Sequence, residues 1–130
     1  MKKVMLLLTC WRTKESPSNF YMINVRNKGK RGELEVAKII NRALGTNVRR
    51  TPNSGGLSFK GDIIDIDYNS VIHDCHFEIK NQKKIQFPLW WKQSTGDCPP
   101  AKIPLVIFKH EHKWLVVQEL NDWLYKIDKK

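Results

Sequence analysis

The spacing of apolar residues predicts an amphipathic helix from Glu33 to Leu44. At about 100° per residue, Ala37, Ile40 and Leu44 fall on one stripe of this segment, and a glycine follows as a typical helix stop. Glu33 lies within roughly 40° of the stripe, so its carboxylate is expected to point inward and to need a partner there. Glu35 lies roughly 200° from Glu33 and is expected to point to solvent.

Alternating apolar and polar residues predict several strands after this helix. Residues 47–50 fit a short strand, and the turn-forming residues 51–56 fit a loop. Residues 61–68 alternate around three isoleucines, and a second alternating segment runs to Lys80 after a turn at 68–70. These two segments are expected to form a hairpin.

The second strand of this hairpin has one apolar and one polar face. Phe77 and Ile79 would lie on the apolar face, and His76, Glu78 and Lys80 on the other. We interpret this polar face as a functional surface.

The rest of the chain predicts a helix over 88–94, a strand pair over 103–109 and 114–117, and a last helix over 119–127. Four apolar residues form a stripe on the last helix: Leu120, Trp123, Leu124 and Ile127. The order helix, strands, helix, strands, helix predicts an α/β sandwich around a mixed sheet. We expect residues 22–130 to form a single domain and residues 1–21 to be an extension without chemistry.

Composition narrows the possible partners. The 130 residues are 41% apolar, enough for one core, and 23 Lys and Arg against 13 Asp and Glu give a net charge of +10. This charge favours nucleic acid or an anionic membrane as partner over an acidic small molecule. No apolar run approaches the roughly 18 residues of a membrane span. The three cysteines, Cys10, Cys75 and Cys98, are widely spaced, which is typical of reduced thiols in a cytoplasm.

The first ten residues resemble a very short lipoprotein signal, with two lysines before an apolar stretch. This stretch is shorter than a usual export core, and the basic body of the chain fits cytoplasmic DNA better than a cell envelope. Met22 is an alternative start just before the domain.

An acidic set with one lysine stands out in this basic chain: Glu33, Asp62, Glu78 and Lys80. Mg²⁺ prefers oxygen ligands and is usually held by one or two carboxylates together with substrate phosphates. Asp62 and Glu78 can act together if their strands pair, and the backbone carbonyl of Ile79 can add a ligand. The metal would polarise a phosphate and lower the pKa of a bound water, so no histidine or cysteine is needed. Lys80 would orient the attacking water or stabilise the developing charge.

These residues resemble a known superfamily. Gly61-Asp62 followed by Glu78-Ile79-Lys80 is similar to the PD-(D/E)XK nucleases, with glycine in place of their proline. Segments 28–33, 48–55 and 77–80 resemble the archaeal-type Holliday junction resolvases and their phage relatives, and the resemblance extends over roughly residues 28 to 125. It implies a restriction-endonuclease-like sandwich, with a central mixed sheet flanked by helices.

The resemblance also implies roles for individual residues. Glu33, Asp62, Glu78 and Lys80 would be catalytic, the three carboxylates and the Ile79 carbonyl would hold the metal, and Gln93 would lie beside them. Alternation puts Asp62 and Asp65 on opposite faces, so only one can be a ligand, and the family spacing favours Asp62. The expected DNA-binding residues are Arg26, Lys28, Lys30, Arg31, Arg49, Arg50, Ser54, Gly55, Lys83 and Gln93.

The expected function is a divalent-metal-dependent DNA endonuclease of the cytoplasm of a prokaryotic or phage-infected cell. Mg²⁺ is the expected cofactor, with one or two ions per site and Mn²⁺ as a substitute. The resemblance favours a homodimeric Holliday junction resolvase that makes paired symmetric nicks in four-way DNA junctions. The alternatives are a nuclease of the same fold that acts on another DNA structure or site, and a non-catalytic DNA-binding module.

Overall fold

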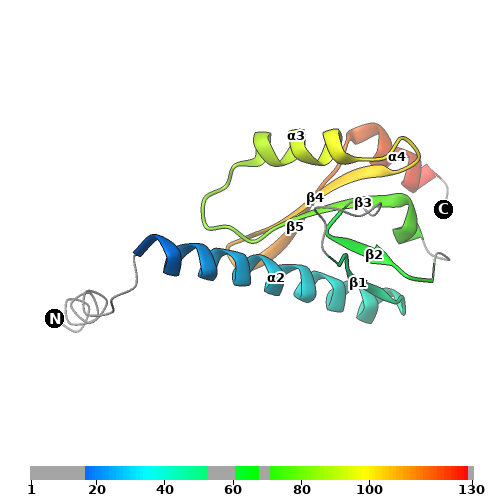
Figure 1. Ribbon diagram of the computed structural model, residues 1–130. Coiled ribbons are helices and arrows are strands. Elements are labelled where there is room, and N and C mark those ends of the chain that lie inside the picture. The colour runs from blue at the N-terminus through cyan, green and yellow to red at the C-terminus, as the bar shows by residue number, and fades with distance from the viewer. Residues whose placement is uncertain (1–16, 53–60, 68–70, 129–130) are drawn as a thin grey trace.

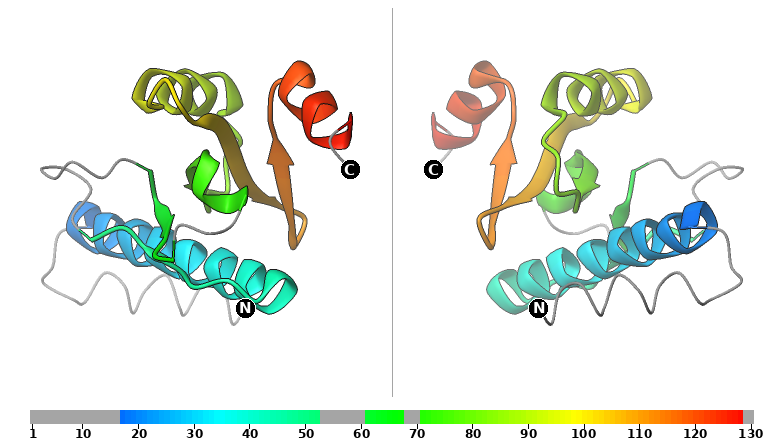
Figure 2. Two further views of the ribbon diagram at one scale, coloured as in Figure 1. Left: turned by 90° about the vertical axis from the view of Figure 1, so that its right-hand side faces the viewer. Right: turned by 90° about the vertical axis from the view of Figure 1, so that its left-hand side faces the viewer.

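The fold has three layers, with a mixed β-sheet between one long helix and two shorter helices. The computed structural model describes residues 17–52, 61–67 and 71–128. Helix α2 runs along one face of the sheet, and α3 and α4 lie side by side on the other (Figures 1 and 2). This is an α/β sandwich with a central mixed sheet flanked by helices, as the sequence predicts.

Helix α2 spans Pro17–Leu44, so it begins sixteen residues before the expected start at Glu33. Gly29 and Gly32 lie inside it, and its N-terminal part extends beyond the sheet (Figure 1). The expected inward stripe is only partly correct. Ala37 is buried and Ile40 packs against the core, but Leu44 is 55% exposed because the helix ends there.

The strands form two sheets, and the expected hairpin over residues 61–80 is wrong for the described residues. Strand β1 (Val48–Arg50) pairs antiparallel with β2 (Ile63–Asp65). The 3₁₀ helix η1 (Val71–Asp74) then leads into β3 (Cys75–Lys80), which is not hydrogen-bonded to β2 as a ladder. Residues 53–60 and 68–70, which include the expected glycine loop and turn, lie outside the described residues.

The central sheet has the order β3-β4-β5. Strand β4 (Ile103–His110) pairs parallel with β3 and antiparallel with β5 (Lys113–Val117), which confirms the expected strand pair. Strand β3 is therefore an edge strand of this sheet. Its outer edge is free to meet residues that arrive from elsewhere in the chain.

The core lies between α2 and the sheets. Phe77 and Ile79 face it from β3, as alternation predicts, and Val36 and Ala37 face it from α2. On the other face of β3, His76 and Glu78 are also buried, at 1% and 4% exposure. The polar face of β3 is thus covered by protein, although it carries ionisable groups.

The two shorter helices differ in how they pack. Helix α3 (Phe87–Asp97) confirms the expected helix and buries Trp90, whose ring lies 5.5 Å from that of Phe108. Helix α4 (Leu120–Asp128) confirms the last helix, but none of its residues is buried. Its apolar stripe is therefore exposed. No helix among the described residues is both long enough and apolar enough to span a membrane.

Candidate active site

Asp62 lies against the outer edge of β3. Its backbone N–H donates to the Phe77 carbonyl at 2.9 Å, and its carboxylate accepts from the Ile79 N–H at 2.6 Å. In a strand, the N–H and C=O of one residue point to the same edge. The Ile79 carbonyl therefore faces the side of β3 on which Asp62 lies.

Glu78 and Lys80 come from the covered face of β3 and form an ion pair. The Lys80 ammonium lies 2.8 Å from a Glu78 carboxylate oxygen and donates to the Gln93 side chain at 3.1 Å. Alternation along β3 puts both side chains on one face, and α3 places Gln93 over that face. Gln93, expected near the site, thus contacts the lysine directly.

Glu33 reaches the site from α2. Its carboxylate pairs with the Arg50 guanidinium at 2.5 Å, and 19% of the side chain is exposed. The glycine before it allows close approach, because a Cβ on Gly32 would lie 2.8 Å from the Cβ of Asn81. The Asn81 amide also donates to the Lys28 carbonyl at 3.0 Å, which fixes α2 to the end of β3.

The carboxylates influence one another electrostatically. Burial raises the pKa of Asp62 from 3.8 to about 7, and the negative charges of Glu78 and Glu33 contribute to the rise. The Ile79 N–H and the Lys80 ammonium oppose it without cancelling it. Three carboxylates from separate parts of the chain therefore influence one another in one region of a basic protein.

This donor set fits a divalent cation in its chemistry. Among residues 17–52, 61–67 and 71–128, no three His, Cys, Asp or Glu side chains are close enough together to enclose a metal ion. Each carboxylate instead faces a donor of the protein: Arg50 for Glu33, the Ile79 N–H for Asp62 and Lys80 for Glu78. The fit is therefore one of ligand type, because carboxylate and carbonyl oxygens are the ligands that a hard cation prefers.

Asp62 and Asp65 are placed differently. Asp65 is 3% exposed, lies on β2 opposite Val48, and accepts a hydrogen bond from the Asp67 N–H at 3.1 Å. Asp62, by contrast, contacts β3 directly. The geometry thus places Asp62 beside Glu78.

The expected DNA-binding residues fall on several surfaces. Arg26, Lys30 and Arg31 are exposed on α2, Lys28 is half-buried there, and Arg49 is exposed on β1. Arg50 is the exception, since its guanidinium is engaged by Glu33. Lys83 is exposed in the loop after β3, while Ser54 and Gly55 lie outside the described residues.

One cluster beside the site was not expected from sequence. Glu35, predicted to point to solvent, accepts hydrogen bonds from the Trp114 indole at 3.0 Å and the Lys109 ammonium at 3.2 Å. These contacts lower the pKa of Glu35, with the Trp114 hydrogen bond as the main cause. The partners are 74 and 79 residues away in sequence, so no local pattern could have found them. Asn81 was also missed, although a glycine inside a basic helix is a signal of close approach.

The Glu-Ile-Lys strand and the α/β sandwich are compatible with the PD-(D/E)XK nuclease superfamily. The chain belongs to the family described as "Phage putative PDDEXK endonuclease", whose profile matches residues 24–130. It is also similar to Protein D14 of Escherichia phage T5, with 28% identity over 118 residues that cover 77% of this chain and 74% of the relative. No solved structure gives a significant match.

Proposed function

We propose that this protein is a divalent-metal-dependent DNA endonuclease that resolves four-way DNA junctions. The observation that carries the nuclease proposal is the electrostatic coupling of Asp62 to Glu78 and Glu33, which together with burial raises the pKa of Asp62 to about 7. Membership of a phage endonuclease family supports the same reading. The junction as substrate rests on the resemblance of segments 28–33, 48–55 and 77–80 to the archaeal-type resolvases.

Each residue of the set has a proposed role. The carboxylates of Glu33, Asp62 and Glu78 and the Ile79 carbonyl hold the cation, for which Mg²⁺ is the proposed ion and Mn²⁺ a substitute. When bound, the cation neutralises the scissile phosphate and lowers the pKa of the attacking water. The Lys80 ammonium stabilises the negative charge that develops on the phosphate.

Gln93 is a positioning residue. Its side-chain oxygen accepts a hydrogen bond from the Lys80 ammonium at 3.1 Å, and the Glu78 carboxylate lies 2.8 Å from the same ammonium. A lysine held by two acceptors loses much of its conformational freedom and is oriented before substrate arrives.

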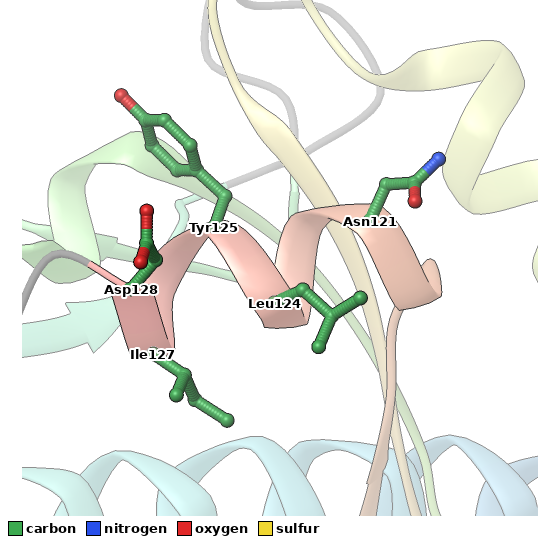
Figure 3. A pocket seen from close by; sticks show the side chains of 5 residues that line it. All are labelled: Asn121, Leu124, Tyr125, Ile127 and Asp128. Atoms are coloured by element: carbon green, nitrogen blue, oxygen red, sulfur yellow. The ribbon is translucent and has the colours of Figure 1, made fainter.

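A junction cut symmetrically needs two active sites, so we propose a two-fold dimer. Helix α4 supplies an apolar surface for it, with Leu120, Trp123, Leu124 and Ile127 between 47% and 65% exposed. A hollow of about 480 Å³ lies along this helix, and Figure 3 shows Leu124 and Ile127 pointing to one side and Tyr125 to the other. Sedimentation of Leu124→Lys tests this surface. Leu89→Lys on α3, where the leucine is 63% exposed, is the matched control and should remain dimeric.

The test of the substrate is cleavage of a labelled four-way junction beside matched linear duplex and single strand, with Mg²⁺ and with EDTA. Paired symmetric nicks in the junction alone, lost in EDTA, are the expected result. Metal-dependent cutting of linear DNA at the same rate as the junction would contradict a resolvase activity but remain consistent with a nuclease. Tight junction binding without cutting under Mg²⁺ or Mn²⁺ would contradict both.

A further inference from the structure

A basic cleft adjoins the contact between α2 and the end of β3. This cleft has a volume of about 520 Å³ and is formed by α2, the loop after β3 and the turn between β4 and β5. The residues that line it are Lys28, Arg31, Glu35, Asn81, Gln82, Lys83, Lys109, His110, Glu111 and His112. Four of them are Lys or Arg, against two carboxylates.

The cleft is separated from the carboxylate set by a single step along the chain. Lys80 contacts Glu78 and Gln93, whereas the next residue, Asn81, lines the cleft. Consecutive side chains at a strand end point to opposite sides. On α2, Lys28 and Arg31 lie within roughly 60° of each other and about 140° or more from Glu33. The two sites therefore adjoin each other without sharing a side chain.

The charges that remain available in the cleft are positive. Glu35 is neutralised by Lys109, whose ammonium also lies 5.3 Å from the centre of the Trp114 ring. Within the part of the chain that the structure describes, Lys28, Arg31 and Lys83 make no ion pair with an acidic residue. The side chain of Glu111, the other carboxylate, is 83% exposed at the tip of the turn. Three free cations on two elements face an open cleft.

The wall formed by the β4–β5 turn is held in place. Glu35 ties it to α2 through Lys109 and Trp114, and Asn81 ties the β3 end to the same helix. Glu111 and His112 have φ values of 49° and 66°, so the turn has a specific left-handed conformation. A cleft with fixed walls and free cations is suited to phosphates at a defined spacing, which a loose set of surface lysines is not.

We infer that this cleft binds backbone phosphates of the DNA on one flank of the cleavage position. The inference rests on the proposed function for its ligand, DNA. Phosphates follow one another at roughly 3.4 Å per nucleotide along the helix axis, so a strand that passes Lys80 reaches Asn81 and the cleft within a few nucleotides. The contacts are to phosphate, so they position the DNA without reading its sequence.

The test compares two double variants on one face of α2. In the first, Lys28→Gln and Arg31→Gln remove two cleft cations. In the control, Lys38→Gln and Arg42→Gln remove the same charge about 15 Å further along the helix, outside the cleft. Binding of the full chain to a labelled junction and to linear duplex is measured in EDTA against salt concentration. The cleft variant should reduce the slope of log K against log[salt] by about 1.8, and the control should change it much less.

A second measurement locates the contact on the DNA. Neutral methylphosphonate groups replace single phosphates near the cleavage position, and the wild type should lose affinity at a small group of adjacent phosphates on one flank. The cleft variant should be insensitive at those same phosphates. Lys83→Gln, which changes only the loop after β3, is the variant to use if the α2 variant fails to fold. It should also lose part of the sensitivity to methylphosphonates at those phosphates.

Equal slope changes in the cleft and control variants, or no insensitive phosphates, would overturn the inference. Because binding is measured in EDTA, this result does not depend on cleavage. If the cleft variant binds DNA weakly and the wild type cuts only linear DNA, the resolvase activity is contradicted and the DNA-binding role of the cleft is supported.

Discussion

The close contact between α2 and the end of β3 makes Gly32→Ala the sharpest test of how the site is assembled. A Cβ at position 32 would lie 2.8 Å from the Cβ of Asn81 and 3.2 Å from the Trp114 ring. The Asn81 Cβ is one bond from the backbone, so it cannot swing aside. Gly29 provides the matched control, because nothing lies within 4 Å of a Cβ there.

The expected magnitudes follow from two opposing effects. Replacing glycine by alanine in a helix interior stabilises by about 1 kcal/mol, and both positions lie well inside α2. At Gly29 that gain should appear in full, as a rise in Tm of about 3–5 °C. At Gly32 the overlap costs about 1–3 kcal/mol, so the free energies of unfolding of the two variants should differ by that amount.

Urea denaturation in EDTA gives this difference, and cleavage assays give its functional counterpart. Gly32→Ala should lose activity beyond its loss of stability, since the displaced helix carries Glu33 and the displaced strand end follows Lys80. Gly29→Ala should cut at the wild-type rate. Equal stabilisation by both substitutions would refute the close approach and, with it, this account of how α2 meets β3.

Five further substitutions test individual groups in the site and on the surface near it. The raised pKa of Asp62 means that metal-free protein binds a proton more tightly than its unfolded chain. Its contribution to stability is therefore full below pH 3.8 and is lost as pH rises through about 7, a change on the order of 4 kcal/mol. Asp62→Asn should flatten this decline in urea titrations at pH 5 and 8 in EDTA, and an unchanged slope would contradict it. Lys80→Gln should slow single-turnover cleavage about 10²–10³-fold, and adding Gln93→Ala to it should slow cleavage little further. Arg49→Ala should reduce the salt slope of DNA binding by about 0.9 and leave single-turnover cleavage intact. Arg50→Ala should also slow cleavage, because the Glu33 carboxylate loses the guanidinium that positions it. Identical behaviour of the two arginine variants would argue against the separate role of Arg50.

Much of the fold follows from local sequence patterns. The strand pair of β4 and β5 and the helices α3 and α4 have periodic apolar residues that packing reinforces. The alternation along β3 also placed Phe77 and Ile79 in the core and Glu78 and Lys80 together on the other face. In these elements local preference and tertiary structure agree.

The predictions that were wrong concern features that depend on residues far apart in the sequence. The helix was expected to begin at Glu33, yet α2 begins at Pro17 and continues through Gly29 and Gly32. Gly32 allows the close approach of Asn81 from another element. The expected hairpin failed because β2 pairs with β1 and β3 pairs with β4, choices that depend on the whole sheet. Asp62 still meets β3, but through two hydrogen bonds at an edge instead of a ladder.

In the candidate site, too, the residue types follow from the sequence, whereas their contacts depend on distant residues. Glu33, Asp62, Glu78 and Lys80 could be selected from residue type and order, because an acidic set in a basic chain is unusual. The residue that contacts each of these groups could not be predicted in the same way. Arg50, which was expected to hold DNA, pairs with Glu33. Glu35 joins a cluster with Lys109 and Trp114 across the fold.

The most direct test of the central claim measures cutting and binding of one labelled four-way junction by wild type and Glu78→Gln. Glu78 is 4% exposed and its carboxylate pairs with Lys80, so glutamine keeps its shape and removes its charge. The wild type should nick the junction with Mg²⁺ and not in EDTA. The variant should not nick it with either, and should bind it in EDTA as tightly as the wild type or more tightly, because repulsion from phosphate is removed. Wild-type cutting by the variant, or loss of binding equal to its loss of cutting, would contradict a metal site at these carboxylates.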